Sequence, residues 1–463
     1  MPRPFLPSSL LTCLLAAAPL SAQAPAEAPA PLGQATTEAL CARYDTAGHW
    51  VQQAVILLSL NTWWHPAGSS MIVKALQDKD ARLGAFGLEA LLRADPALLP
   101  QVATAELLDE LIARQLGRNN ALLRERVLQA LKRLAPDVEA ADKAAWTRWW
   151  GQTKATWAPA PWTAREQPTG AGGGTTAAAE RAFDLYQHGL DMLICIDSTG
   201  SMQPTIDALG EALAEMADIL DGISPKLRLG VVHYKDYADF GKQGAKVAQP
   251  FTANIRDARR ELADLRADGG GDLPEAVLGG LTLALDDSLR WKPDANKLVV
   301  LIGDAPPHGN EAQAVVDLAR AAHETPDRRG SEPTTGAKAA APTTPFLISC
   351  IGVFLELQGK LREQEGYREF VDSQKRMRED FQAIAKAGGG IFVDVTFTFT
   401  DEKPKDPPKG KGKDANKGGS IASSATRRIV EHILVLSFGE RFAREMRDFA
   451  RIFYEYKEAK LIK

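Results

Sequence analysis

The sequence contains few cysteines, carries no basic excess and has no long apolar segment after its first twenty residues. Four cysteines occur in 463 residues, and no two of them have the spacing of zinc ligands. The formal net charge of −4 gives no electrostatic reason to expect nucleic-acid binding. A disulfide framework, a zinc module, a nucleic-acid partner and a transmembrane segment in the mature chain are therefore not expected.

The amino terminus has the character of an export signal. Arg3 precedes an apolar stretch at residues 10–20, which is too short to span a bilayer. Small residues follow at 21–24, and cleavage after Ala22 or after Ala24 is compatible with them. We therefore expect residues 1–24 to be a signal peptide and the mature protein to be exported, either periplasmic or secreted.

Helical periodicity without strand-like alternation follows a short Ala/Pro-rich linker at residues 25–35. The stretch LEALLRADP at 88–96 resembles LQALKRLAP at 128–136, an offset of 40 residues that is typical of HEAT-type helical pairs. We expect an all-α HEAT-like domain at 36–157, which would act as a scaffold or binding surface. A Gly/Pro-rich linker is expected at 158–182.

Strand and helix patterns alternate from residue 183 onward, which predicts a doubly wound, mostly parallel sheet of the α/β class. Two polar insertions, at 324–344 and 401–420, should be disordered loops within this 183–440 domain. A last helix, at 441–463, has one apolar face and should dock. The expected strands lie at residues 192–196, 226–234, 246–251, 297–302, 345–353 and 390–396.

Three polar loops fall where strands end or helices begin in this pattern. Their oxygen-bearing side chains should meet at one edge of the sheet, where open α/β sheets bind ligands. Such hard oxygen ligands suit a small hard cation such as Mg²⁺. The candidate ligands are Asp197, Thr199, Ser201, Asp272 and Asp304.

Four further polar residues near these loops receive other interpretations. We expect Glu275 to complement the amino end of a helix. His308, in a proline-rich loop, reads as a surface residue, and Asp236 as a turn residue. His233 should lie near the metal but not on it.

The motifs DSTGSM at 197–202, RLGVVHYKDY at 228–237 and GGGDLPEAV at 269–277 resemble the von Willebrand factor A (vWA) domain. The likeness is greatest to the subgroup found beside alpha-kinase domains, although no kinase domain is visible here. The resemblance implies a Rossmann-like fold with a metal-ion-dependent adhesion site (MIDAS). Thr199 and Ser201 would then bind Mg²⁺ directly, while Asp197 and Asp304 would act largely through water.

The same resemblance implies that one metal position accepts a carboxylate from a protein partner. Asp272 stands where adhesion-type members often have threonine. If Asp272 binds the metal directly, it adds negative charge to the site, which should then attract an acidic ligand less. Alternatively, Asp272 contacts the ligands without touching the metal, or it favours Ca²⁺ or Mn²⁺.

Three functions remain open from the sequence. The preferred one is an exported, metal-dependent protein-binding module, used for adhesion or as a scaffold and without enzymatic activity. A metal-dependent hydrolase or phosphatase is the alternative, but Thr199 stands where aspartyl-phosphatase chemistry needs a second aspartate. The G-x-S-x-G pattern of a serine nucleophile is also absent around Ser198 and Ser201. The third possibility is a structural scaffold with an inactive metal site.

Overall fold

The computed structural model describes residues 34–61, 65–163, 174–270, 273–324, 344–363, 365–399 and 419–461. The predicted signal peptide, Asp272 and nearly all of the two predicted insertions lie outside these residues. Within the described ranges, no helix is long and apolar enough to cross a membrane.

The amino-terminal part is helical, as predicted. Its helices begin at polar caps: for example, Asp80, Asn120 and Asp142 each accept a hydrogen bond from a backbone N–H of the following helix. HEAT-type repetition remains a prediction. The helices are α1 (Gln34–Thr46), α2 (Trp50–Leu58), α3 (Ser69–Gln77), α4 (Ala81–Arg93), α5 (Leu99–Val102), α6 (Ala105–Asp109), α7 (Ala121–Leu134) and α8 (Lys143–Thr153).

The predicted linkers are shorter than expected. Helix α1 already begins at Gln34, inside the predicted 25–35 linker. Helix α9 (Gly174–His188) takes up the last part of the predicted 158–182 linker. Its alanine run favours helix, and Ala179, Ala182 and Leu185 are buried where α9 packs beside α2.

The α/β part is built on a six-stranded sheet in the order β3-β2-β1-β4-β5-β6. Every neighbouring pair is parallel except β2 and β3, so the prediction of a mostly parallel sheet is confirmed. Strand β3 lies at an edge, where Pro250 removes no bond from a central ladder. The strands are β1 (Leu190–Asp197), β2 (Arg228–Tyr234), β3 (Ala245–Thr252), β4 (Asn296–Gly303), β5 (Phe346–Leu357) and β6 (Gly389–Phe399).

Helices cover both faces of the sheet. On one face, Leu193 and Cys195 of β1 pack in a core with α14 (Val277–Ala284), α15 (Ala312–Glu324) and α16 (Tyr367–Ala387). On the other face, Met192 and Ile194 belong to a core that continues without a break into the amino-terminal helices. Elements contributing to this second core include α10 (Gln203–Glu215), α11 (Ala217–Ile223), α13 (Ile255–Asp264), α17 (Gly419–Phe438) and α18 (Ala443–Glu458).

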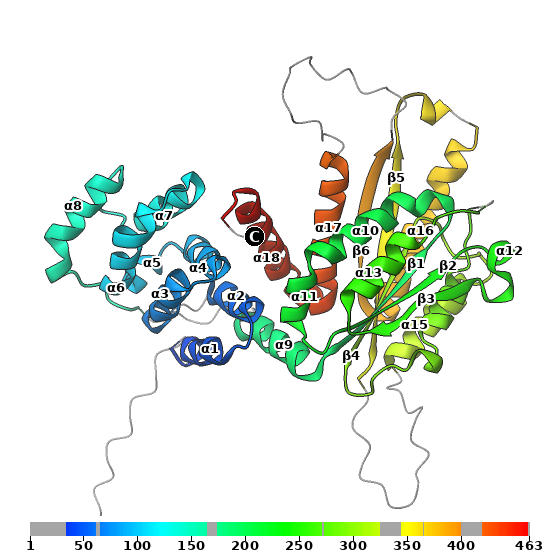
Figure 1. Ribbon diagram of the computed structural model, residues 1–463, viewed down its shortest axis with the longest axis horizontal. Helices are drawn as coiled ribbons and strands as arrows, with labels where there is room; N and C mark the ends of the chain where they lie inside the picture. The colour runs from blue at the N-terminus through cyan, green and yellow to red at the C-terminus, as the bar shows by residue number, and fades with distance from the viewer. Residues whose placement is uncertain are drawn as a thin grey trace, which may run out of the picture.

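The last helix, α18, lies between the amino-terminal helices and the α/β part (Figure 1). Its apolar face is buried, as predicted, and Trp50 of α2 stacks on Phe449 and Phe453. On the other side, Tyr454 donates a hydrogen bond to Glu215 of α10 at 2.8 Å. The helix therefore joins the two parts of the chain.

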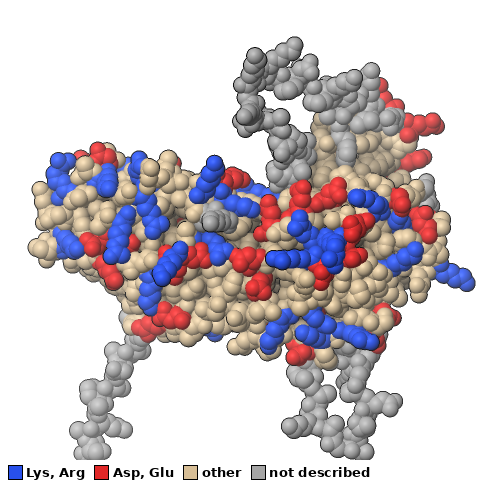
Figure 2. Space-filling model, in the orientation of Figure 1, with Lys and Arg blue, Asp and Glu red and all other residues tan. Residues whose placement is uncertain are grey.

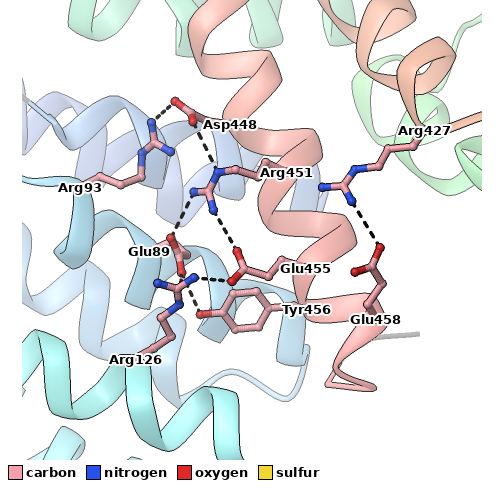
Figure 3. Close-up of polar contacts among 9 residues, drawn as sticks. All are labelled: Glu89, Arg93, Arg126, Arg427, Asp448, Arg451, Glu455, Tyr456 and Glu458. Carbon is pink, nitrogen blue, oxygen red and sulfur yellow. Dashed lines mark hydrogen bonds and ion pairs between the residues drawn. The ribbon is translucent and has the colours of Figure 1, made fainter. Parts of the chain in front are cut away.

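A buried carboxylate anchors α18 to the amino-terminal helices (Figure 3). Glu89 of α4 has a side chain only 3% exposed, and Arg451 and Tyr456 of α18 donate hydrogen bonds to it at 3.4 and 3.2 Å. Arg126 of α7 lies 3.3 Å from the same carboxylate and also pairs with Glu455 of α18. Three helices thus share one buried negative charge.

The surface shown in Figure 2 carries acidic and basic side chains interspersed over both parts of the chain. Among the described residues visible on this face, no large area bears one sign of charge only. This distribution agrees with the small formal net charge of −4.

Candidate metal centre

The described parts of all three predicted polar loops meet at the carboxyl edge of the sheet. Strands β1 and β4 are parallel neighbours, so Asp197 at the end of β1 and Asp304 just after β4 emerge at the same edge. Thr199, Ser201 and Asp304 line one open pocket of about 330 Å³. The structure thus brings together four of the five predicted ligands, and Asp272 lies outside the described residues.

Asp197 holds the first loop through one carboxylate oxygen, while its other carboxylate oxygen accepts no hydrogen bond from the described residues. Its Oδ1 accepts hydrogen bonds from the backbone N–H of Thr199 at 2.8 Å and from the Thr199 hydroxyl at 2.7 Å. Its Oδ2 is fully buried and has no hydrogen-bond partner among the described residues. A buried carboxylate oxygen of this kind is costly unless a cation or a proton accompanies it.

The electrostatics of the two carboxylates favour a cation beside them. Burial, together with the negative charge of Asp304, raises the pKa of Asp197 well above its usual range. Burial also raises the pKa of Asp304, against the opposing effect of a hydrogen bond from Ser201. A divalent cation would supply the positive charge that both groups lack. The residues present therefore fit a metal such as Mg²⁺, with two hydroxyls and two carboxylates as candidate ligands.

A glycine loop closes against the Asp197 loop. Gly269 and Gly270 have φ values of +70° and +77°, a region that favours glycine. The N–H of Gly200 donates to the carbonyl of Gly269 at 3.4 Å, and a Cβ on Gly270 would lie 3.1 Å from the Cβ of Thr199. These two glycines let the loop approach the candidate ligand Thr199 closely.

Glu275 belongs to the pocket, which corrects the prediction that it complements a helix end. Helix α14 begins only at Val277, and the Glu275 side chain is buried and lines the same pocket as Ser201 and Asp304. Its backbone N–H donates to the carbonyl of Pro306 at 3.0 Å, which fixes it beside the Asp304 loop. No local signal in the sequence separates the two positions, because Pro274 is compatible with a helix that begins there.

His308 is also less exposed than predicted. Its Nε2 lies 3.1 Å from a carboxylate oxygen of Asp236, and its ring stacks on Tyr237 with centroids 5.4 Å apart. The His308 side chain is 23% exposed, so it is not a plain surface residue. Asp236 caps the short helix α12 (Tyr237–Phe240), as expected of a turn residue. The contact ties the loop after β2 to the loop that carries Asp304.

His233 lies behind the site, as expected. Its Nδ1 is 2.9 Å from the Ser198 hydroxyl, whose residue is fully buried and so is not exposed as a nucleophile. Burial and the positive charges of Lys235 and Lys246 lower the pKa of His233 to about 4, which keeps the ring neutral at pH 7.

The site does not depend on a dense cluster of classical ligands. Over the ranges that the structure describes, no group of three or more His, Cys, Asp or Glu side chains could hold a metal ion. The candidate centre instead combines the carboxylates of Asp197 and Asp304 with the hydroxyls of Thr199 and Ser201.

Comparison with known proteins identifies the α/β part. Residues 191–324 match the family model of the von Willebrand factor A domain. The chain therefore contains a vWA domain, and the resemblance predicted from its motifs is confirmed.

Two curated relatives share this region. The chain is 33% identical over 135 residues to alpha-protein kinase vwkA of Dictyostelium discoideum. This match covers 28% of this chain and 20% of that protein. The chain is also 33% identical over 119 residues to the putative ariadne-like RING finger protein R811 of Acanthamoeba polyphaga mimivirus, which covers 26% of this chain and 11% of that protein. The chain thus spans a fifth or less of the length of these relatives.

Solved structures with some likeness include BatB from Bacteroides thetaiotaomicron. BatB is 20% identical to this chain, and the match covers 45% of this chain and 91% of BatB, with a TM-score of 0.30. Proximal thread matrix protein 1 from the mussel byssus, in a structure with a zinc-occupied MIDAS motif, is 13% identical, covers 44% of this chain and 41% of that chain, and has a TM-score of 0.28. Likeness at this level adds nothing to the function.

Proposed function

We propose that the vWA domain binds a divalent cation through Asp197, Thr199, Ser201 and Asp304, and that this cation coordinates an acidic group of a protein partner. The protein would then act as a metal-dependent binding module, for adhesion or as a scaffold, rather than as an enzyme. The observation that carries this proposal is the buried carboxylate of Asp197, with Asp304 and two hydroxyls beside it at an open pocket.

The donor set suits partner binding. Thr199 and Ser201 would contribute neutral oxygens, while Asp197 and Asp304 would balance the charge of the cation. A bound Mg²⁺ supplies a Lewis-acidic position that water or a partner carboxylate can occupy. Mg²⁺ is our first choice of metal, with Ca²⁺ and Mn²⁺ as alternatives, and Asp272 is proposed as a further member of the site.

We also propose that the chain is exported, on the basis of the signal-peptide pattern at residues 1–24. The amino-terminal helices would offer a second interaction surface. The export proposal can be checked by localising the full-length protein and determining the amino terminus of its mature form.

Metal binding can be tested by urea unfolding of the mature chain with Mg²⁺ or EDTA. At 100 times the dissociation constant, Mg²⁺ should raise the free energy of unfolding by about 2.7 kcal/mol. Asp304→Asn should abolish the increase, whereas Asp317→Asn, an exposed site on α15, should keep it. Equal stability with Mg²⁺, Mn²⁺, Ca²⁺ and EDTA would contradict the proposal.

Partner binding needs a second measurement. Immobilised protein should retain carboxylate-bearing peptides with Mg²⁺ and release them with EDTA. Retention that ignores the chelator would show that the metal takes no part in recognition.

A further inference from the structure

An apolar groove continues from the metal pocket along the first turns of α16. Strands β5 and β6 extend beyond the rest of the sheet, since residues 353–357 pair only with 395–399, and this ribbon projects past the other strands (Figure 1). Helix α16 leans on the ribbon, where Gln374 donates a hydrogen bond to the carbonyl of Leu355 at 3.4 Å. We call the hollow between them the α16 groove, lined chiefly by Phe354, Leu355, Leu357, Tyr367, Phe370 and Val371.

The α16 groove and the metal pocket form one continuous surface. Leu355 and Phe370 line both hollows. A ligand held at Asp304 would therefore have the apolar groove directly beside it.

Solvent exposure of apolar side chains is concentrated here. Within the described residues, the exposed large hydrophobic side chains are Val247, Leu273 and Val371. Leu273 lines the metal pocket and Val371 lines the α16 groove, whereas Val247 lies on the edge strand β3. Apolar side chains gathered beside a polar site are typical of a binding surface.

The size and chemistry of the groove restrict what it can accept. Its volume of about 160 Å³ has room for about five water-sized groups, which is the size of one large aliphatic side chain. Three polar residues, Glu356, Gln374 and Thr396, also line the groove, and Arg362 forms an ion pair with Glu356 at 3.6 Å, so this carboxylate already has a partner. The groove thus suits an apolar side chain better than a charged one.

We propose that the α16 groove binds a large apolar side chain of the same partner segment whose carboxylate is held at the metal. This inference rests on the proposed function and narrows the partner to a protein segment with a Leu-, Ile-, Met- or Phe-sized side chain close in sequence to an acidic residue. In an extended segment, side chains on one face recur every second residue. The fixed geometry of pocket and groove should therefore select one spacing between the two residues.

The test uses the full mature chain and a display library of seven-residue peptides with a fixed central glutamate. With Mg²⁺, retained peptides should be enriched in large apolar residues at one spacing from the glutamate. A peptide with that residue replaced by serine should bind about tenfold more weakly, since burial of one such side chain would be lost.

Two surface variants test whether the α16 groove causes the preference for an apolar residue. Val371→Ser should remove the apolar enrichment while leaving Mg²⁺-dependent retention of glutamate peptides in place. Val247→Ser, a matched change at an equally exposed valine away from the groove, should leave the enrichment unchanged. Because both positions are exposed, neither change should disturb folding.

The outcomes separate this inference from the proposed function. Mg²⁺-dependent retention with no preferred apolar position, or with a preference that survives Val371→Ser, would overturn the groove and leave the metal site standing. Retention that is the same with Mg²⁺ and EDTA would overturn the proposed function, and the groove proposal with it.

Discussion

Replacing Glu89 by glutamine should destabilise the protein by about 2–3 kcal/mol, because it removes a buried charge that two arginines and a tyrosine share. The Glu89 side chain is 3% exposed and lies within 3.2–3.4 Å of Arg126, Arg451 and Tyr456. Breaking a fully buried ion pair costs about 3–5 kcal/mol. Both arginines keep Glu455 as a second partner, so the expected loss is smaller than that range.

A matched control lies on α18, the helix that supplies two of the partners of Glu89. Glu458 pairs with Arg427 at 3.3 Å, but its side chain is 70% exposed. Glu458→Gln should therefore change the free energy of unfolding by less than about 1 kcal/mol. Both pairs appear in Figure 3, and both glutamates become glutamine, so burial is the main difference.

The assay is urea denaturation of the full chain at several protein concentrations, with unfolding monitored by circular dichroism. The core on one face of the sheet continues into the amino-terminal helices, so loss of the Glu89 contacts should lower the midpoint of the main transition. Equal midpoints for Glu89→Gln and Glu458→Gln would refute the reasoning. An early separate transition in Glu89→Gln alone would instead show that α18 leaves the amino-terminal helices before the sheet unfolds.

Three further predictions concern the metal pocket. Gly270→Ala should destabilise the protein by about 1–2 kcal/mol and weaken Mg²⁺ binding, because the new Cβ would press on Thr199. The control Gly241→Ala, also at positive φ but with open space around it, should cause backbone strain and leave Mg²⁺ binding unchanged. Urea unfolding measures the stability of each variant, and metal titration measures its Mg²⁺ affinity. Glu275→Gln should strengthen Mg²⁺-dependent retention of an acidic peptide about fivefold, since removing one nearby negative charge is worth about 1 kcal/mol, and unchanged or weaker retention would contradict this. The folded-state pKa of His233, about 4, lies below its unfolded value, so this residue should oppose folding increasingly as pH falls from 7 to 5. The wild-type protein should therefore lose stability relative to His233→Gln over this range, and parallel pH profiles of the two proteins would argue against it.

The sheet and half of the site geometry follow from local sequence patterns. Uninterrupted apolar runs indicate buried parallel strands, and the run at 297–302 lies within β4 as expected. Because parallel strands end at one edge, Asp197 and Asp304 had to emerge together once β1 and β4 became neighbours. Local pattern and strand direction were sufficient for this pair.

Long-range packing could not be predicted in the same way. The apolar face of α18 indicated that the helix docks, but periodicity does not say against which surface. Glu89 looks like an ordinary solvent-exposed helix charge in the sequence, and only the approach of Arg126 and Arg451 from other elements gives it a buried role. Glu275 was misplaced because its helix was predicted to start too early.

The position of α18 has a consequence for biosynthesis. Helices α2 and α4 are translated well before α18, yet their apolar surfaces are covered by α18. Until residues 443–458 emerge, Trp50 and Phe86 lack their ring contacts with Phe449. A premature stop before Ala443 would therefore leave the apolar surfaces of α2 and α4 exposed to proteases and chaperones.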